Sequence, residues 1–358
     1  HLHWEVTANP LQVLIFRQEE DGTCRLMEVI QSNGSAFEQV EYVQMDNAPG
    51  YELVVGRQLS DQVLRSVSVY SFSSGSAEQL MMVGYSKFIT CDLNDDGCSE
   101  LMVILPGESE TGTGSAVLYR MQDGNIERSV EVNVSEDATH IRRITVGRLL
   151  GGTPAVFVAS AVNNSAIVTD VFAWRNDRFS NISYSRDLDT SVQTLRNYYV
   201  YAEDIDGDGV MELPSLITMK RVFPEQEGKQ KFLIRWFDLE GREMDKFFTF
   251  HNYLGGWYMQ LASSWAPRVS VEQEGGKYTF YVWDEDYRQA LDVFSIYALT
   301  GGNREEDATV DGRFAFYRAE GVVYAAKLEA NAAEFGITEN QLINNFHLIQ
   351  QDWKTGET

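Results

Sequence analysis

The chain has 358 residues, of which 44% are hydrophobic and 23% charged, an ordinary balance that excludes an intrinsically disordered protein. It has 29 basic and 53 acidic residues, which gives a formal net charge of −24 at pH 7. A surface this negative repels phosphate groups, so nucleic acids and anionic membrane surfaces are poor partners. The longest apolar stretch, around residues 154–162, is far shorter than the roughly 20 residues of a membrane-spanning helix.

The first residue and the cysteines bear on where the protein acts. The sequence begins with His1 rather than Met, so we expect a processed chain that has lost a secretory signal or a lipoprotein leader, unless residues 1–3 are the remnant of a tag. Cys24, Cys91 and Cys98 are too few for a disulfide framework. Free thiols are expected, although Cys91 and Cys98 are close enough in sequence to pair across a short loop.

The first two thirds of the chain predict β-strands in repeats. Strands are expected at 13–16 and 25–30, around an Asp-Gly turn, and they fit an incomplete blade at one terminus of a ring. Farther on, an apolar strand begins at four comparable anchor positions, 48, 55 and 57 residues apart. This period is typical of propeller blades with four strands each. The anchors are Glu52, Glu100, Ala155 and Glu212.

Two of these repeats carry an acidic loop before the strand. Residues 92–100 (the first acidic loop) and 204–212 (the second acidic loop) both read D-x-[DN]-x-D-G-x-x-E. Calcium takes about six to eight oxygen ligands, and a tight loop turns side chains at positions 1, 3 and 5 toward one point. Glycine at position 6 permits the reversal that brings the carbonyl of position 7 inward.

The pattern therefore predicts two structural calcium sites. In the first loop the expected ligands are the side chains of Asp92, Asn94, Asp96 and Glu100 and the carbonyl of Cys98. In the second loop they are the side chains of Asp204, Asp206, Asp208 and Glu212 and the carbonyl of Val210.

The acidic loops have two other possible interpretations, an EF-hand and a pair of solvated turns. An EF-hand requires a carboxylate at position 12, where this chain has Val103 and Ser215, and it requires flanking helices where strands are expected. A pair of solvated Asp-Gly turns without an ion remains the simpler alternative. Carboxylates crowded into one turn repel one another, which favours the metal site over that alternative.

The pattern changes after Gly255-Gly256, which is read as a hinge. Strands are predicted at 257–261, 268–272, 278–283, 293–299 and 322–328. Thr338 and Gln341 form a capping box that predicts a helix, and apolar residues follow at helical spacing, namely Leu342, Phe346, Ile349 and Trp353. The predicted fold is mainly β, with a β-propeller-like repeat domain of about five blades at 1–254 and a small α+β C-terminal module with a terminal helix at 255–358.

The acidic loops, each continuing into Leu and an apolar strand, resemble the FG-GAP and VCBS repeats of integrin α-chain propellers and of many secreted bacterial proteins. The resemblance covers roughly residues 1–250, and Glu100 and Glu212 stand where that family usually has Asp. It implies a propeller with structural calcium, located outside the cell, that binds a partner rather than transforms it. The region with Trp257 and Ser264-Trp265 resembles the tails of surface lipoproteins from anaerobic Gram-positive bacteria.

The sequence contains no recognisable catalytic motif, such as G-x-S-x-G, H-E-x-x-H or a phosphate-binding loop. The glycine-rich segment 107–114 is expected to be a blade loop, His140 an exposed or core-edge residue, and residues 284–286 (Asp-Glu-Asp) a solvated turn. No catalytic residue is therefore assigned, and the sequence favours a protein that is not an enzyme.

The favoured function is an extracellular or cell-surface, calcium-stabilised binding protein. We expect a monomer with a protein or glycan ligand and no nucleic-acid partner, and a lipid anchor on the removed N-terminus is compatible with this function. The alternative is a carbohydrate-active hydrolase or lyase with its site in the propeller depression or in a cleft between domains. Two carboxylates about 5–10 Å apart beside an exposed tryptophan would favour the enzyme.

Overall fold

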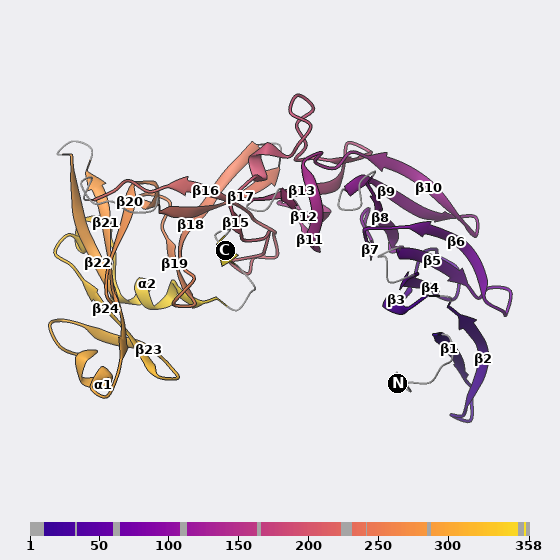
Figure 1. Ribbon diagram of the computed structural model, residues 1–358, viewed down its shortest axis with the longest axis horizontal. Helices are drawn as coiled ribbons and strands as arrows, with labels where there is room; N and C mark the ends of the chain where they lie inside the picture. The colour runs from indigo at the N-terminus through magenta and orange to yellow at the C-terminus, as the bar shows by residue number, and fades with distance from the viewer. Residues whose placement is uncertain are drawn as a thin grey trace. The chain divides into compact units, whose positions relative to one another are not determined.

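The computed structural model describes residues 11–32, 34–59, 65–107, 113–162, 166–222, 231–240, 242–284, 288–349 and 354–355. The fold is mainly β, with 59% of the described residues in strands and 7% in helices, and neighbouring strands pair antiparallel in its several sheets (Figure 1). The chain forms two compact units, His1–Val192 (unit 1) and Gln193–Thr358 (unit 2). No helix in the described part of the chain has both the length and the apolar character needed to cross a membrane.

Unit 1 contains one β-hairpin and three sheets of four consecutive strands. The hairpin pairs β1 with β2, and the sheets comprise β3 to β6, β7 to β10 and β11 to β14. The strands are β1 (Gln12–Gln18), β2 (Cys24–Gln31), β3 (Ala36–Val43), β4 (Glu52–Gln58), β5 (Arg65–Ser71), β6 (Glu78–Gly84), β7 (Lys87–Cys91), β8 (Glu100–Pro106), β9 (Thr113–Gln122), β10 (Asn125–Val132), β11 (Ala138–Arg148), β12 (Pro154–Val162), β13 (Ala166–Arg175) and β14 (Arg178–Asn181).

The apolar central strands of unit 1 are explained by packing on both faces of a sheet. In β8, Leu101 and Val103 join the core shared with the sheet of β3 to β6, while Met102 and Ile104 join the core shared with the sheet of β11 to β14. Successive side chains of a strand point to opposite faces, so a strand between two cores is apolar throughout. The outer strands, such as β10, alternate between exposed and half-buried residues.

The four-stranded repeat expected from the sequence is thus present in unit 1, but the ring is not confirmed. None of the sheets formed by the described residues closes on itself, and a five-bladed propeller remains a prediction. The β1–β2 hairpin packs Ile15 and Ile30 against Leu53 and Val55 of β4. The hairpin therefore extends the stack of sheets as a short additional layer.

Unit 2 contains two five-stranded sheets and a short two-stranded one. Their strand orders are β16-β17-β18-β19-β25, β20-β21-β22-β24-β23 and β15-β26. The strands are β15 (Tyr198–Tyr199), β16 (Leu213–Thr218), β17 (Phe232–Glu240), β18 (Arg242–Asn252), β19 (Trp257–Leu261), β20 (Val269–Glu274), β21 (Lys277–Asp284), β22 (Gln289–Thr300), β23 (Phe314–Ala319), β24 (Val322–Leu328), β25 (Phe346–Leu348) and β26 (Lys354–Thr355). The helices are α1 (Arg304–Asp307), α2 (Glu339–Asn344) and the 3-10 helices η1 (Val192–Thr194), η2 (Ala266–Arg268) and η3 (Ala332–Phe335).

One large core joins the two five-stranded sheets of unit 2. It contains Leu233 and Phe248 from the first sheet and Phe280 and Phe294 from the second. The division expected between residues 254 and 255 falls inside unit 2, in the turn that connects the paired strands β18 and β19. A separate α+β module over 255–358 is not shown.

The predicted C-terminal helix is only partly formed. Its capping box is confirmed, because the Thr338 hydroxyl accepts the Gln341 backbone N–H and the Gln341 side chain accepts the Thr338 backbone N–H. The helix ends at Asn344, however, and Phe346 lies in β25, which pairs with the edge of β19. Asparagine competes for backbone hydrogen bonds, so the Asn344-Asn345 pair favours a stop there. Trp353 lies outside the described residues.

The three cysteines are free, as expected from their number and spacing. Burial raises the pKa of the Cys91 thiol to about 12, and the nearby carboxylates of Glu100 and Asp92 add to this shift. A thiol with so high a pKa is almost entirely protonated near pH 7 and is a poor nucleophile.

Candidate metal centre

Three loops, each of which leads into a strand, share one internal hydrogen bond. They are the first acidic loop, which leads into β8, the second acidic loop, which leads into β16, and a third loop at residues 44–52 (the Gln44 loop), which leads into β4. The glutamate at the ninth position is buried in all three, and its Oε2 atom accepts the backbone N–H of the residue seven positions earlier. These bonds are Met45 to Glu52 at 3.1 Å, Leu93 to Glu100 at 2.9 Å and Ile205 to Glu212 at 3.1 Å.

This shared bond changes the role expected of Glu100 and Glu212. One carboxylate oxygen of each residue closes its own loop by accepting a backbone amide, a charge-assisted bond of the strong kind. Each glutamate is therefore first a structural clamp, and its other carboxylate oxygen, Oε1, is the candidate ligand atom. The same bond at Glu52, in a loop without the acidic motif, shows that the clamp does not depend on a metal site.

The second acidic loop brings three carboxylates together. Oxygen atoms of Asp204, Asp206 and Asp208 all lie within 4.8 Å of one another. Oδ2 of Asp204 accepts the Gly209 N–H at 2.9 Å, while Oδ1 is buried without a hydrogen-bond partner. Gly207 and Gly209 have φ angles of 77° and 87°, a backbone conformation that favours glycine. The loop therefore concentrates negative charge at one point and leaves a buried carboxylate oxygen for a cation.

The first acidic loop has similar backbone bonds, but Asp92 accepts hydrogen bonds through both of its carboxylate oxygens. Asp92 accepts the Asp96 N–H at 3.2 Å through Oδ1 and the Gly97 N–H at 2.8 Å through Oδ2. The Asn94 amide donates to Oδ2 of Asp96 at 2.9 Å, and the Cys98 N–H donates to Oδ1 of Asp96 at 2.8 Å. The loop as it stands is held together by its own hydrogen bonds.

A guanidinium also contacts the first acidic loop. Nε of Arg120, on β9, lies 3.3 Å from Oε1 of Glu100, and its Nη2 lies 3.5 Å from Oδ2 of Asp96. The guanidinium carbon lies 5.9 Å from the centre of the Trp174 ring, close enough for a cation–π contact. Despite the nearby arginine, burial raises the pKa of Glu100 above its ordinary value. Arg120 thus supplies a positive charge that partly offsets the negative charge of Glu100 and Asp96.

The corresponding position beside the second loop is acidic. Leu101 of β8 is opposite Tyr119 of β9, and Leu213 of β16 is opposite Phe237 of β17. The residue after Tyr119 is Arg120, and the residue after Phe237 is Asp238, which is buried. The residue at the strand position that corresponds to Arg120 is therefore a carboxylate.

The three loops differ in how well they fit calcium. The second loop fits best, because its donors are carboxylates and one buried oxygen has no hydrogen-bond partner. The first loop has Asn94 where the second has Asp206, and Arg120 must release Glu100 and Asp96 first. In the Gln44 loop, the Gln44 amide donates to the carbonyls of Ala48, at 3.0 Å, and Asp46, and position 5 is Ala48 rather than a carboxylate. That loop is satisfied by its own side chain and does not fit an ion.

The remaining candidates from the sequence are spread through the fold. His140 lies on β11 and is largely exposed. Partial desolvation of its ring, together with the charge of Arg142, lowers its pKa. Asp284 ends β21, while 285–287 lie outside the described residues, as do 108–112 of the glycine-rich segment. Arg120 could not be anticipated from the sequence, because its contact with Glu100 depends on cross-strand register rather than on a local motif.

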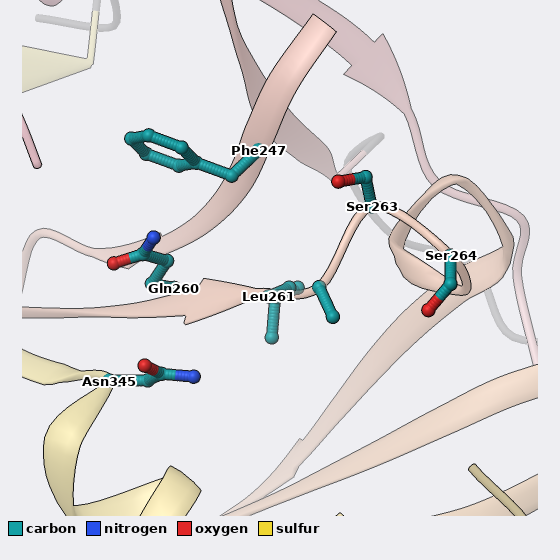
Figure 2. Close-up of a pocket in the computed structure, with 7 residues that line it drawn as sticks. Phe247, Gln260, Leu261, Ser263, Ser264 and Asn345 are labelled. Carbon is teal, nitrogen blue, oxygen red and sulfur yellow. The ribbon is translucent and has the colours of Figure 1, made fainter. Parts of the chain in front are cut away.

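A pocket of about 420 Å³ lies in unit 2, at the end of β19 (Figure 2). A second pocket of about 180 Å³ adjoins it and shares several of its residues, including Leu261 and Asn345. Neither pocket could be anticipated from the sequence, because their walls come from β18, β19, α2 and the segments between them.

The solved structures that are similar to this chain share little sequence with it. No family model and no curated protein matches the chain. Similar solved structures include the exotype rhamnogalacturonan lyase YesX, with a TM-score of 0.35 and 9% identity over 82% of this chain and 70% of that one. Rhamnogalacturonan lyase YesW has a TM-score of 0.33 and 12% identity over 89% and 75% of the two chains. The Bacillus licheniformis rhamnogalacturonan lyase PL11 has a TM-score of 0.33 and 10% identity over 87% and 69%. These TM-scores are below the level that indicates a shared fold, so no fold or function is assigned to this chain from these structures.

Proposed function

We propose that this protein is a calcium-stabilised binding protein that acts outside the cell, either secreted or attached to the cell surface. The observation that carries the proposal is the carboxylate cluster of Asp204, Asp206 and Asp208, with the buried Oδ1 atom of Asp204. Such a set of oxygen donors suits a hard divalent cation better than it suits a transition metal. The role of the ion is structural, because no reacting group adjoins the cluster in the sequence motif.

The second acidic loop is the tighter of two proposed sites. Its ligands are the side chains of Asp204, Asp206, Asp208 and Glu212, with the carbonyl of Val210. The first acidic loop forms a weaker site, in which Arg120 competes with the ion for Glu100 and Asp96. A bound calcium ion would supply positive charge that offsets the repulsion between carboxylates, and the loop residues would hold the start of the following strand in place.

We also propose that the repeats are propeller blades of the FG-GAP and VCBS type. What supports this is that the Gln44 loop and the first acidic loop each join the first and second strands of a four-stranded sheet. Successive sheets of unit 1 also share cores face to face, as blades do. An extracellular location agrees with calcium modules of this type, whose affinities of about 10⁻⁴–10⁻³ M match the calcium level outside cells.

Calcium titration of the full-length chain by calorimetry tests the proposal. We expect saturable binding by the calcium-free protein, and Asp206→Asn should weaken the tighter site by roughly tenfold or more, since it removes one charged ligand. Asp137→Asn, at an exposed carboxylate outside the loops, is the matched control and should bind as the wild type does. Absence of binding at millimolar calcium, or equal binding by Asp206→Asn and the wild type, would contradict the proposal.

A further inference from the structure

The two adjoining pockets of unit 2 form one groove beside the end of β19. Both are lined by Gln260, Leu261, Ala262, Ser264 and Asn345. The larger, at about 420 Å³, is within the range of roughly 300–1,000 Å³ that is common for small-molecule sites. In Figure 2 the Gln260 and Asn345 amides lie on the same side of the larger pocket, and Ser263 and Ser264 lie at its other end.

The backbone fixes the two amides next to each other. The Gln260 N–H donates to the Asn345 carbonyl at 2.9 Å, which connects β19 to the end of α2. Within the described part of the chain, neither side-chain amide has a hydrogen-bond partner in the protein, and both side chains are partly exposed. Each amide can donate and accept, as can the hydroxyl of Ser264, so the groove presents unused donors and acceptors together.

The described lining of the groove is uncharged. Among the described residues that line the two pockets there is no Asp, Glu, Lys, Arg or His, although charged residues make up 23% of the chain. A phosphate or carboxylate ligand entering the groove would lose water without gaining an ionic partner, which is costly. The chemistry of the lining therefore selects against charged ligands.

Apolar side chains complete the walls. Phe247 borders the larger pocket, and Trp265 and Phe335 border the smaller one. A ligand that matches both features has hydroxyl groups that donate and accept, and apolar C–H faces that can pack on aromatic rings. Sugars without acidic groups have this combination.

We propose that this groove binds an uncharged carbohydrate of one or two sugar rings. The inference rests on the proposed function, because it names the ligand class of that binding protein. The same lining argues against glycoside cleavage in the groove, since the described lining provides no carboxylate pair to act as acid and base. Gln260 and Asn345 are the residues that determine specificity for hydroxyl groups.

A glycan array followed by calorimetry of the full-length chain tests the inference. The array holds uncharged di- to tetrasaccharides, uronic-acid-containing counterparts and uncharged peptides. We expect saturable binding to at least one uncharged sugar, and Asn345→Ala and Gln260→Ala should each weaken it roughly tenfold by removing hydrogen bonds to the ligand. Asn340→Ala, at an exposed asparagine of α2 that does not line the groove, should leave the affinity unchanged.

Several outcomes would overturn the inference. These are binding only to uronic-acid sugars or only to peptides, binding to nothing on the array, and equal binding by Asn345→Ala and Asn340→Ala. Calcium titration of the same preparation separates the two proposals. Intact calcium binding without sugar binding overturns the groove alone, whereas sugar binding without calcium binding overturns the proposed metal sites alone.

Discussion

Nε of Arg120 lies 3.3 Å from Oε1 of Glu100, and this contact brings a guanidinium to the first acidic loop. The second acidic loop has the same motif, but Asp238 occupies the position that corresponds to Arg120. Two loops with the same motif therefore have residues of opposite charge at the corresponding position of the next strand. Because calcium affinity depends on the net charge of the ligand set, the two loops should differ in affinity.

Substituting Arg120 should raise the calcium affinity of the first loop. In Arg120→Gln the ion no longer competes with a guanidinium, and we expect affinity to rise by about tenfold, a modest figure because Arg120 is partly exposed. Calorimetry in a background in which Asp204, Asp206 and Asp208 are all replaced by Asn isolates the first loop from the second.

The control for that substitution is Arg128→Gln. Arg128 forms an exposed ion pair with Glu131, at 2.7 Å, on the same sheet. Its removal changes the net charge of the chain by the same amount but should leave the calcium affinity unchanged. Equal effects of the two substitutions would mean that overall charge, rather than the contact with Glu100, sets the affinity.

Removal of calcium should destabilise both units. The first loop belongs to unit 1 and the second to unit 2, so a chelator acts on each. A ligand present at a hundredfold excess over Kd stabilises the folded state by about 2.7 kcal/mol, and the tighter loop should give unit 2 the larger share. Calorimetric melting with and without chelator measures the loss, and hydrogen exchange assigns it to a unit. Superimposable melting curves would show that the ions are absent or contribute no stability.

The acidic loops could be predicted from sequence because their geometry is local. The Gly97 N–H donates to Asp92 and the Gly209 N–H donates to Asp204, so each bond spans only five residues. Both glycines have a positive φ angle. The four-stranded repeats were predictable for a similar reason, since strand alternation and turns are local signals. Arg120 was not, because it reaches Glu100 through pairing between β8 and β9.

The organisation of unit 2 was harder to predict because it depends on pairing between distant segments. Gly255-Gly256 resembled a hinge, but it forms a tight turn in which the Gly256 N–H donates to the Tyr253 carbonyl at 3.3 Å. Phe346 continued a helical pattern, yet the edge of β19 recruits it into β25. A turn hydrogen bond in the first case, and pairing with the edge of a sheet in the second, outweighed the local pattern.

Glu52 provides a test of the buried clamp and of its dependence on pH. Burial raises the pKa of Glu52, with a further contribution from Asp46, while the Met45 N–H acts in the opposite direction. A raised pKa means that the folded state favours the protonated form. This group's contribution to stability is therefore greatest below the unfolded pKa of about 4.3 and is lost as pH rises through the folded value.

Glu52→Gln keeps the acceptor for Met45 without the buried charge. We expect this variant to unfold at higher urea than the wild type at pH 7, and the difference to shrink as pH falls toward 4. Glu52→Leu, which removes the acceptor, should instead cost about 1–3 kcal/mol at either pH. A gap between Glu52→Gln and the wild type that widens on acidification would contradict the direction of the pKa shift.

Phe346 should be a major contributor to the stability of unit 2. It is 8% exposed, and its ring centre lies 5.0 Å from that of Tyr324 and 5.4 Å from that of Trp257. Phe346→Ala leaves a cavity between β25 and these rings and should lower the free energy of unfolding by about 3–5 kcal/mol. Ile343→Ala, at a residue of α2 that is 42% exposed, should cost no more than about 0.5 kcal/mol. Urea unfolding measures both, while calcium binding at the first loop, in unit 1, should remain unchanged in either variant. Equal costs for the two substitutions would show that β25 is not part of the core of unit 2.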